Sequence, residues 1–319
     1  MRCIWQKLSF ILLFLLCVFS SPLKAQEQEV TLLTWNVADL YYPGDTSEMG
    51  KNRDNRVDSI VSLLKERSKE WQVVLLQEVW TKQGLAKLQN LKDVYPYILD
   101  ADAHKIDVEE VLNNAWKFLS VKWAVDNEEK IDPILNRGLT ILSQLPILDS
   151  KTLTFSVNGD PKFARFDGEM LAGKGAVAVL LQDDVLNKKF WVVNTHLVAN
   201  YQNNPKHPQG YGEQRAQQIL ELGDWIQNFN TEKLPVVLAG DLNVGPDHDT
   251  TPSVWQKIPE LLQQFFIPHE YDSKPTHNCG EVDHVFGTEE LLVETTDSIP
   301  ARELKISDHD ALMGRILFL

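Results

Sequence analysis

Cysteine is scarce in this sequence, and its scarcity excludes a fold held together by disulfide bonds. Only three of the 319 residues are cysteine. Cys3 and Cys17 lie in an N-terminal segment that we expect to be removed, so the mature chain would keep only Cys279. No disulfide can then form within one chain, and burial of apolar side chains has to stabilise the fold. With 43% hydrophobic residues, a chain of this length can bury a sizeable core.

Basic residues are also too few for general binding to polyanions. The chain has 31 Lys and Arg against 45 Asp and Glu, and without residues 1–25 the basic count falls to 28, for a net charge of -17. Such a chain does not bind nucleic acid broadly through counterion release, so no stable nucleic-acid partner is expected. An acidic enzyme can still act on nucleic acid through a local basic groove or a metal ion, and that alternative stays open.

Residues 1–25 have the composition of a secretory signal peptide. Arg2 and Lys7 give a basic start, and the apolar run Leu8–Phe19 is shorter than the about 20 residues that a membrane span needs. Ala25 offers a small residue at the cleavage point. We therefore expect cleavage and a secreted or periplasmic protein, with a retained anchor as the alternative.

No repeat, low-complexity tract or Gly/Ser/Pro-rich linker divides the chain after residue 30. Helical periodicity predicts helices over Asn55–Leu64 and Glu213–Phe229. The apolar runs typical of strands are Val30–Trp35, Val73–Leu76, Leu139–Leu142, Ala176–Leu181, Phe190–Val193, Pro235–Ala239, Val282–Phe286 and Ala311–Phe318. The alternation predicts one α/β domain from about residue 28 to residue 319.

Polar side chains stand at one end of six of these runs. They are Asn36, Gln77 with Glu78, Asn194 with His196, Asp241 with Asn243, Asp283 with His284, and Asp308 with His309. Open α/β sheets place ligand sites at strand ends, although a single acid there is most often a turn or a helix cap. Six placements that carry amides, carboxylates and imidazoles together favour a catalytic site.

The motifs around these residues resemble the endonuclease/exonuclease/phosphatase superfamily, whose fold is deoxyribonuclease I-like. In chain order they are Thr34-Trp35-Asn36-Val37, Leu76-Gln77-Glu78-Val79, Asn194-Thr195-His196-Leu197, Gly240-Asp241-Leu242-Asn243, Asp283-His284-Val285-Phe286 and Ser307-Asp308-His309. The resemblance implies an α/β (α+β) fold, a four-layer α/β/β/α sandwich of two mixed β-sheets flanked by helices. It also implies phosphoester hydrolysis that depends on a divalent metal, usually Mg²⁺ with Mn²⁺ as a substitute.

The resemblance assigns the metal site to Glu78, with Asn36 bound directly or through water and Asp308 completing or supporting the site. These residue types suit Mg²⁺, a hard cation that prefers oxygen ligands and neutralises an anionic phosphodiester. The chain contains no His-Glu-x-x-His and no paired Cys-x-x-Cys motif, so a dedicated zinc site is not expected.

The same resemblance makes His309 the general base, polarised by Asp283. A carboxylate beside an imidazole fixes its tautomer and raises its basicity. Asp241 is then expected to orient the attacking water or the developing negative charge, and Asn243 to donate to a phosphate oxygen. His196 occupies the place of a phosphate-binding or leaving-group histidine, and which histidine gives the proton stays open.

Two further segments are similar to neutral sphingomyelinases. His196–Tyr201 matches their His-x-x-Ala-x-Tyr stretch, and Glu169 stands five residues before Lys174-Gly175, where those enzymes typically carry Asp. A Walker A loop is excluded, because Gly175 stands where Ser or Thr must hold Mg²⁺. The resemblance assigns Lys174 and Tyr201 to substrate binding, with Asn194 in a supporting, more structural role. The alternative for this segment is a glycine-rich hairpin with a solvated lysine.

The sequence therefore predicts a secreted Mg²⁺-dependent phosphodiesterase that cleaves sphingomyelin to ceramide and phosphocholine at a membrane surface. The alternatives are an extracellular Mg²⁺-dependent nuclease and a phosphatase acting on inositol phospholipids, both of which would want basic residues near the site. The oligomeric state stays open. The spacing of apolar and aromatic residues in 104–133 predicts either a core-facing helix or a surface element that touches lipid. The histidines outside the motifs are expected to be solvated loop residues: His104, His207, His248, His269 and His277.

Overall fold

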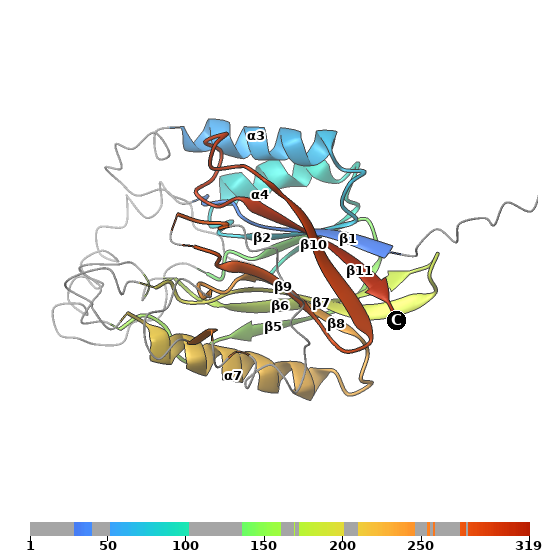
Figure 1. Cartoon of the computed structure of the whole chain (residues 1–319). Helices are drawn as coiled ribbons and strands as arrows, with labels where there is room; N and C mark the ends of the chain where they lie inside the picture. The colour runs from blue at the N-terminus through green and yellow to red at the C-terminus, as the bar shows by residue number, and fades with distance from the viewer. Residues whose placement is uncertain are drawn as a thin grey trace, which may run out of the picture.

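The computed structural model describes residues 29–39, 52–101, 136–160, 169, 172–200, 210–245, 254–255, 258, 275–278 and 280–319. Two β-sheets lie face to face, with helices on the outer face of each (Figure 1). This arrangement confirms the predicted α/β/β/α sandwich of two mixed sheets. The domain limits 28–319 stay a prediction, and the signal segment 1–25, residues 104–133 and Tyr201 lie outside the described residues.

The larger sheet has six strands in the order β10-β11-β1-β2-β4-β3. They are β1 (Glu29–Asn36), β2 (Val73–Gln77), β3 (Tyr97–Asp100), β4 (Thr140–Ser143), β10 (Leu291–Ile299) and β11 (Ala311–Phe318). β1 pairs in parallel with β2 and antiparallel with β11.

The smaller sheet has five strands in the order β5-β6-β7-β8-β9. They are β5 (Ile147–Thr154), β6 (Gly175–Asp183), β7 (Lys188–His196), β8 (Val236–Asp241) and β9 (Asp283–Gly287). Only β7 and β8 pair in parallel among these strands.

Helices cover the outer faces of both sheets (Figure 1). α3 (Arg53–Glu66), α4 (Lys82–Leu88) and the short 3₁₀ helix η1 (Gln89–Leu91) lie on the six-stranded sheet, and α7 (Gly212–Phe229) lies on the five-stranded sheet. None of the helices in the described ranges combines the length and hydrophobicity needed to cross a membrane.

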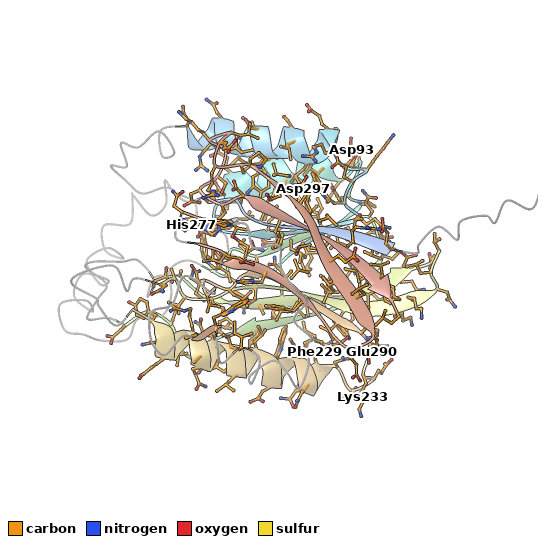
Figure 2. All side chains as sticks on the ribbon, viewed as in Figure 1. Asp93, Phe229, Lys233, His277, Glu290 and Asp297 are labelled. Carbon is orange, nitrogen blue, oxygen red and sulfur yellow. The ribbon has the colours of Figure 1, made fainter. Side chains whose placement is uncertain are left out.

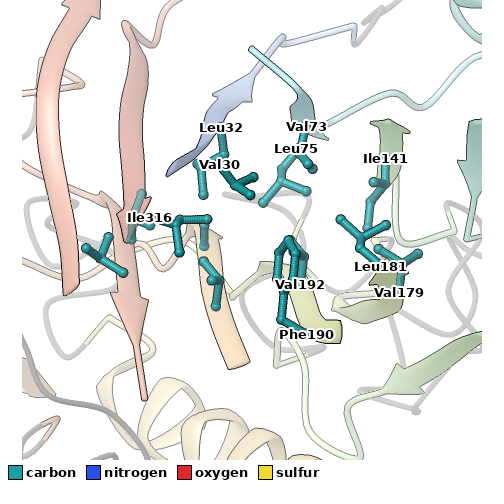
Figure 3. Packing of buried hydrophobic residues seen from close by; sticks show 14 of the residues in the cluster. Val30, Leu32, Val73, Leu75, Ile141, Val179, Leu181, Phe190, Val192 and Ile316 are labelled. Atoms are coloured by element: carbon teal, nitrogen blue, oxygen red, sulfur yellow. The ribbon is translucent and has the colours of Figure 1, made fainter. Parts of the chain in front are cut away.

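Alternation along the strands divides the core into layers. In β1, Leu32 faces the other sheet and Leu33 faces α3, because successive strand side chains point to opposite faces. The cluster between the sheets contains Leu75, Val179 and Val192 from three further strands (Figure 3). Burial on both faces explains why these strands are continuous apolar runs in the sequence.

All eight predicted strands and both predicted helices are present with small shifts at their ends. The prediction missed β3, β5, β10 and α4. β3 and β5 are edge strands. The side chains of β5 are exposed or half-buried, so the sequence of β5 has no apolar run. α4 spans only seven residues, too few for a helical pattern to stand out.

Strand directions bring the predicted site residues to one edge, which is the same end of both sheets. The parallel pairs β1/β2 and β7/β8 place Asn36 opposite Gln77 and His196 opposite Asp241 at their carboxyl ends. The antiparallel strand β9 starts there, with Asp283 opposite Asp241. β11 also starts at this edge, because Leu312 pairs with Thr34, two residues before Asn36.

Candidate active site

Asn36 connects carboxylates from both sheets. Its Nδ2 donates to Glu78 Oε1 at 3.1 Å and to Asp241 Oδ2 at 3.0 Å. Its Oδ1 accepts the backbone N–H of Ala38 at 3.0 Å, and this bond sets which way the amide points. Asn36 therefore holds the two acids in place, while its role as a metal ligand stays a prediction.

Glu78 has the properties of a cation ligand. It follows β2 in a left-handed backbone conformation, with φ of 57°. Burial raises the pKa of its carboxyl group, and the nearby charge of Asp308 raises it further. A carboxylate beside the buried Glu78 carboxyl group favours a cation between them. Glu78 and Asp308 offer carboxylate oxygens, so the residues present fit a hard divalent cation such as Mg²⁺.

His309 and Asp283 form a buried pair. His309 Nδ1 donates to Asp283 Oδ2 at 2.8 Å, and its Nε2 lies 3.7 Å from Asp241 Oδ2. Burial by itself lowers the pKa of His309, but the charges of Asp283 and Asp241 outweigh it and raise the pKa to about 10. The Trp35 indole N–H donates to the His309 carbonyl at 3.1 Å, and the Ser307 hydroxyl accepts the His309 backbone N–H. The ring and the backbone of His309 are therefore both held.

His196 lies on the other side of Asp241. Its Nε2 is 3.5 Å from Asp241 Oδ2, 3.9 Å from Glu78 Oε1 and 2.8 Å from Lys174 Nζ. Burial lowers the pKa of His196 well below its usual range, and the adjacent charge of Lys174 adds to the effect. The ring is therefore neutral, and one of its nitrogens can accept a hydrogen bond from the ammonium group.

Lys174 is part of the site rather than a solvated side chain, because only 3% of it is exposed. The alternative of a solvated hairpin lysine is therefore wrong. Its Nζ lies 3.5 Å from Glu169 Oε2, which also accepts the backbone N–H of Ala199 at 3.1 Å. Glu169 thus reaches the lysine, and β6 begins at Gly175, directly after Lys174.

The end of β8 presents Asp241 and, two residues later, Asn243. A side chain at Gly240 would place its Cβ 2.1 Å from the Thr195 carbonyl, and its φ is 144°, so glycine is required there. Asp241 Oδ1 accepts the Asn243 backbone N–H at 2.9 Å, and Asn243 Nδ2 donates to the Leu197 carbonyl at 3.0 Å. Burial and the neighbouring Asp283 raise the pKa of Asp241.

Asn194 joins the two sheets behind these groups. Its Oδ1 accepts from Gln77 Nε2 at 2.7 Å, and its Nδ2 donates to the carbonyls of Leu76 and Thr140 at 2.9 and 3.3 Å. These contacts agree with a structural role. Substrate contact by Asn194 stays a prediction, as it does for Tyr201.

His277 is close to the site, contrary to the sequence prediction of a solvated loop residue. Its ring stacks on His309 with centroids 4.7 Å apart, and the two residues also form a backbone bridge. His277 belongs to no motif and reaches His309 from a loop distant in the sequence, so no local signal could have revealed it.

The chain is similar in sequence to one protein family and to curated proteins. The family described as Endonuclease/Exonuclease/phosphatase family matches residues 33–309. A "Putative neutral sphingomyelinase" of Drosophila melanogaster is 24% identical over 317 residues, which cover 90% of this chain and 60% of that protein. "Sphingomyelin phosphodiesterase 2" of Homo sapiens is 28% identical over 202 residues, covering 62% of this chain and 38% of that protein. The chain thus spans 38–60% of the length of these two curated relatives.

Solved structures share the fold. SmcL has a TM-score of 0.64 at 16% identity, and a Staphylococcus aureus beta toxin with bound magnesium ions has 0.61 at 18%. Each alignment covers 90% of this chain and 99% of the other. A Caenorhabditis elegans TDP2 has a TM-score of 0.54 at 14% identity, covering 91% of this chain and 98% of that chain. At these identities the likeness establishes the deoxyribonuclease I-like fold alone.

Proposed function

Because the chain belongs to the endonuclease/exonuclease/phosphatase family, we propose that it is a Mg²⁺-dependent phosphodiesterase that hydrolyses sphingomyelin to ceramide and phosphocholine. The observation that carries the reaction type is the buried His309–Asp283 pair, 2.8 Å apart, beside the acids Asp241 and Glu78. The relatives named as sphingomyelinases and the buried Glu169–Lys174 pair support the choice of substrate.

The cation would be held by Glu78 and Asp308 with Asn36, and when bound it would neutralise the charge of the phosphate and of the leaving oxygen. Mn²⁺ would substitute for Mg²⁺ at these oxygen donors.

Proton transfer would belong to His309. Its Nε2 would accept the proton of the attacking water, and Asp283 at Nδ1 would stabilise the resulting imidazolium. Asp241, 3.7 Å from Nε2, would orient the water. With a pKa of about 10, His309 is protonated at neutral pH in the metal-free protein. It would act as a base only when bound cation and substrate offset the negative charge of the surrounding acids and so lower this pKa.

Phosphate binding would fall to the opposite side of the site. The Lys174 ammonium and the neutral His196 ring would face the anionic oxygens, and Asn243 would donate to one of them. The buried Lys174 ammonium group would place positive charge close to the phosphodiester, where it is worth most, and the neutral His196 ring would act as a hydrogen-bonding group.

We propose a membrane phospholipid as the partner. A secreted or periplasmic location is proposed from the composition of residues 1–25. The excess of 45 acidic over 31 basic residues suits a zwitterionic surface such as sphingomyelin better than an anionic one. The same excess speaks against a stable nucleic-acid partner.

The test is a substrate panel with the purified protein. Sphingomyelin, phosphatidylcholine, plasmid DNA and an inositol phospholipid are offered side by side with Mg²⁺, with excess chelator, and with Mg²⁺ restored. We expect chelator-sensitive release of phosphocholine from sphingomyelin, and a loss of several orders of magnitude in Glu78→Gln. Full activity in chelator would overturn the metal site, and preference for DNA or the inositol lipid would overturn the substrate.

Lys174→Ala tests the phosphate-binding side. Losing a buried charged contact costs on the order of 1–3 kcal/mol, so kcat/KM for sphingomyelin should fall roughly tenfold to a hundredfold. Lys174→Arg keeps the charge and serves as the control. Unchanged kcat/KM in Lys174→Ala would remove Lys174 from the proposed site.

A further inference from the structure

A buried arginine outside the six motifs lies at the same end of the molecule as the proposed cation site. Arg56 stands in the first turn of α3, and only 4% of it is exposed. α3 begins at the left-hand end of the sheets in Figure 1, and Figure 2 labels His277, which stacks on His309, at that end. A buried guanidinium group needs nearby acceptors, so its partners indicate which parts of the chain it holds.

The guanidinium group of Arg56 bridges two segments that are far apart in the sequence. Its Nη2 donates to the Ala38 carbonyl at 3.0 Å, two residues after Asn36. Its Nη1 donates to the Ile306 carbonyl at 3.3 Å, two residues before Asp308. One planar group therefore holds the segment that follows β1 against the segment that precedes β11.

The segment after β1 is also tied to the backbone of Glu78. The Asp39 backbone N–H donates to the Glu78 carbonyl at 3.1 Å, and the Asp39 carboxylate accepts the Thr81 hydroxyl at 2.7 Å. Ala38 and Glu78 both have a left-handed backbone, with φ of 48° and 57°. Residues other than glycine adopt this conformation at a cost, so it persists only where surrounding contacts hold it. The bond from Arg56 to the Ala38 carbonyl is such a contact.

The segment before β11 is joined to the first segment by a hydroxyl group as well. Ser307 Oγ donates to the Asn36 carbonyl at 2.6 Å and accepts the His309 backbone N–H at 3.2 Å. Asp308 lies between these two residues, so its backbone is held against the segment of Asn36. The Asn36 amide in turn donates to Glu78 at 3.1 Å. The positions of the two carboxylates therefore depend on how these segments are held together.

We propose that Arg56 is a positioning residue for the divalent cation, because it fixes the separation of the segments that carry Glu78 and Asp308. It acts through backbone carbonyl groups rather than as a ligand. Lysine cannot take its place, since a single ammonium group lacks the planar fork that reaches carbonyls of both segments. The inference rests on the proposed function, of which the cation site is a part.

The test measures cation affinity rather than turnover. The full metal-stripped chain is titrated with Mn²⁺, which we expect to substitute for Mg²⁺, and the free ion is followed by electron paramagnetic resonance. Arg56→Lys should raise the Kd for Mn²⁺ about tenfold to a hundredfold, the range seen when a group behind the metal ligands is lost. An unchanged Kd would overturn the role of Arg56 while leaving the proposed function standing.

Arg215→Lys is the matched control. Arg215 is also buried, in α7 on the other sheet, and its Nη1 donates to the Ala199 carbonyl at 3.2 Å. The segment that carries Ala199 follows β7 and holds neither Glu78 nor Asp308. The control should therefore lose stability and keep the Mn²⁺ Kd of the unaltered protein. A Kd raised equally in both variants would show a general effect of losing a buried guanidinium group and would overturn the proposal.

A second substitution covers a failure of the first to fold. Should Arg56→Lys not fold by circular dichroism, Arg56→Gln decides in the same way, because it keeps an amide donor and buries no unpaired ammonium group. Loss of the fold in both variants would assign Arg56 to stability alone and would overturn the proposal.

Kinetics separate cation affinity from the chemical step. Hydrolysis of a soluble phosphodiester is measured over a range of Mg²⁺ concentrations. In Arg56→Lys the half-saturating Mg²⁺ concentration should rise by about the same factor as the Kd, whereas kcat at saturating Mg²⁺ should change by a smaller factor. A lower kcat with an unchanged requirement for Mg²⁺ would contradict a positioning role at the cation.

Two further outcomes distinguish this inference from the proposed function. Mn²⁺ binding that Glu78→Gln leaves unchanged would overturn the proposed cation site and the inference that rests on it. Mn²⁺ affinity that depends on both Glu78 and Arg56, in a chain that hydrolyses no phosphodiester, would overturn the proposed function and leave the role of Arg56 standing.

Discussion

His309 shows how its neighbours set the charge of one side chain. The pKa of a free histidine is about 6.5, and burial alone would lower that pKa. Asp283 and Asp241 instead raise the pKa to about 10. We expect NMR titration of the metal-free protein to show the His309 ring protonated well above pH 7, and Asp283→Asn to move the midpoint back toward 6.5. A midpoint near 6.5 in the unaltered protein would contradict the proposed charge state.

His284 shows the opposite effect. It is fully buried, its Nε2 donates to the Val244 carbonyl at 2.6 Å, and its ring stacks on Trp255. Burial lowers its pKa to about 4, although the bond to Val244 acts in the other direction. The unfolded chain therefore binds more protons between about pH 4 and 6.5, and the free energy of unfolding falls as the pH decreases through that range.

Keeping His284 neutral contributes about 3 kcal/mol to the free energy of unfolding. This contribution is complete above pH 6.5 and is lost by about pH 4. Denaturant unfolding at pH 7.5 and 4.5 measures it, with His284→Gln as the variant that cannot titrate. The variant should lose about 2.5 kcal/mol less than the unaltered protein between the two pH values. An equal pH dependence in both would show that His284 is not the group responsible.

At the scale of elements, Arg302 joins the turn after β10 to the segment that carries His309. Its Nε and Nη2 donate to Asp310 Oδ2 at 2.9 and 2.7 Å, and its backbone N–H donates to Oδ1 at 3.0 Å. Nη2 also donates to the Pro275 carbonyl at 2.8 Å, two residues before His277. The segments that carry His277 and His309 are therefore both held by one planar guanidinium group.

Arg302→Lys should weaken this connection, because lysine lacks the two-pronged geometry. We expect a loss of about 2 kcal/mol in the free energy of unfolding and a lower kcat with little change in KM. Asp310→Asn should cost a similar amount, and the double variant should lose clearly less than the two separate losses together. Fully additive losses in a denaturant double-mutant cycle would mean that the two residues act independently.

At the scale of the whole molecule, the acids of the site come from both sheets, and the charge of Asp308 raises the pKa of Glu78 as the charge of Asp283 raises that of Asp241 in the metal-free protein. Glu78 follows β2 of the six-stranded sheet, and Asp241 ends β8 of the five-stranded sheet. A cation bound only by the folded state stabilises it by about 2.7 kcal/mol at a concentration of about 100 Kd. Mg²⁺ should therefore raise Tm by several degrees in a chain of this size.

Glu78→Gln provides the comparison for this shift. It removes one repelling charge, so the metal-free variant should melt at or above the Tm of the unaltered protein, and Mg²⁺ should no longer raise it. Differential scanning fluorimetry with and without chelator measures both values. A Mg²⁺-dependent shift that persists in Glu78→Gln would place the stabilising cation elsewhere.

The sequence by itself determined the features that depend on neighbouring residues. Apolar runs predicted eight strands because those strands are buried, and the motif around Asp308 and His309 is continuous in the chain. Edge strands such as β5 were missed because solvent on one side removes their apolar pattern. Tertiary structure alone decided which distant side chains meet. It buried Lys174 against His196 and stacked His277 on His309, because sheet register and loop closure, rather than residue identity, set those distances.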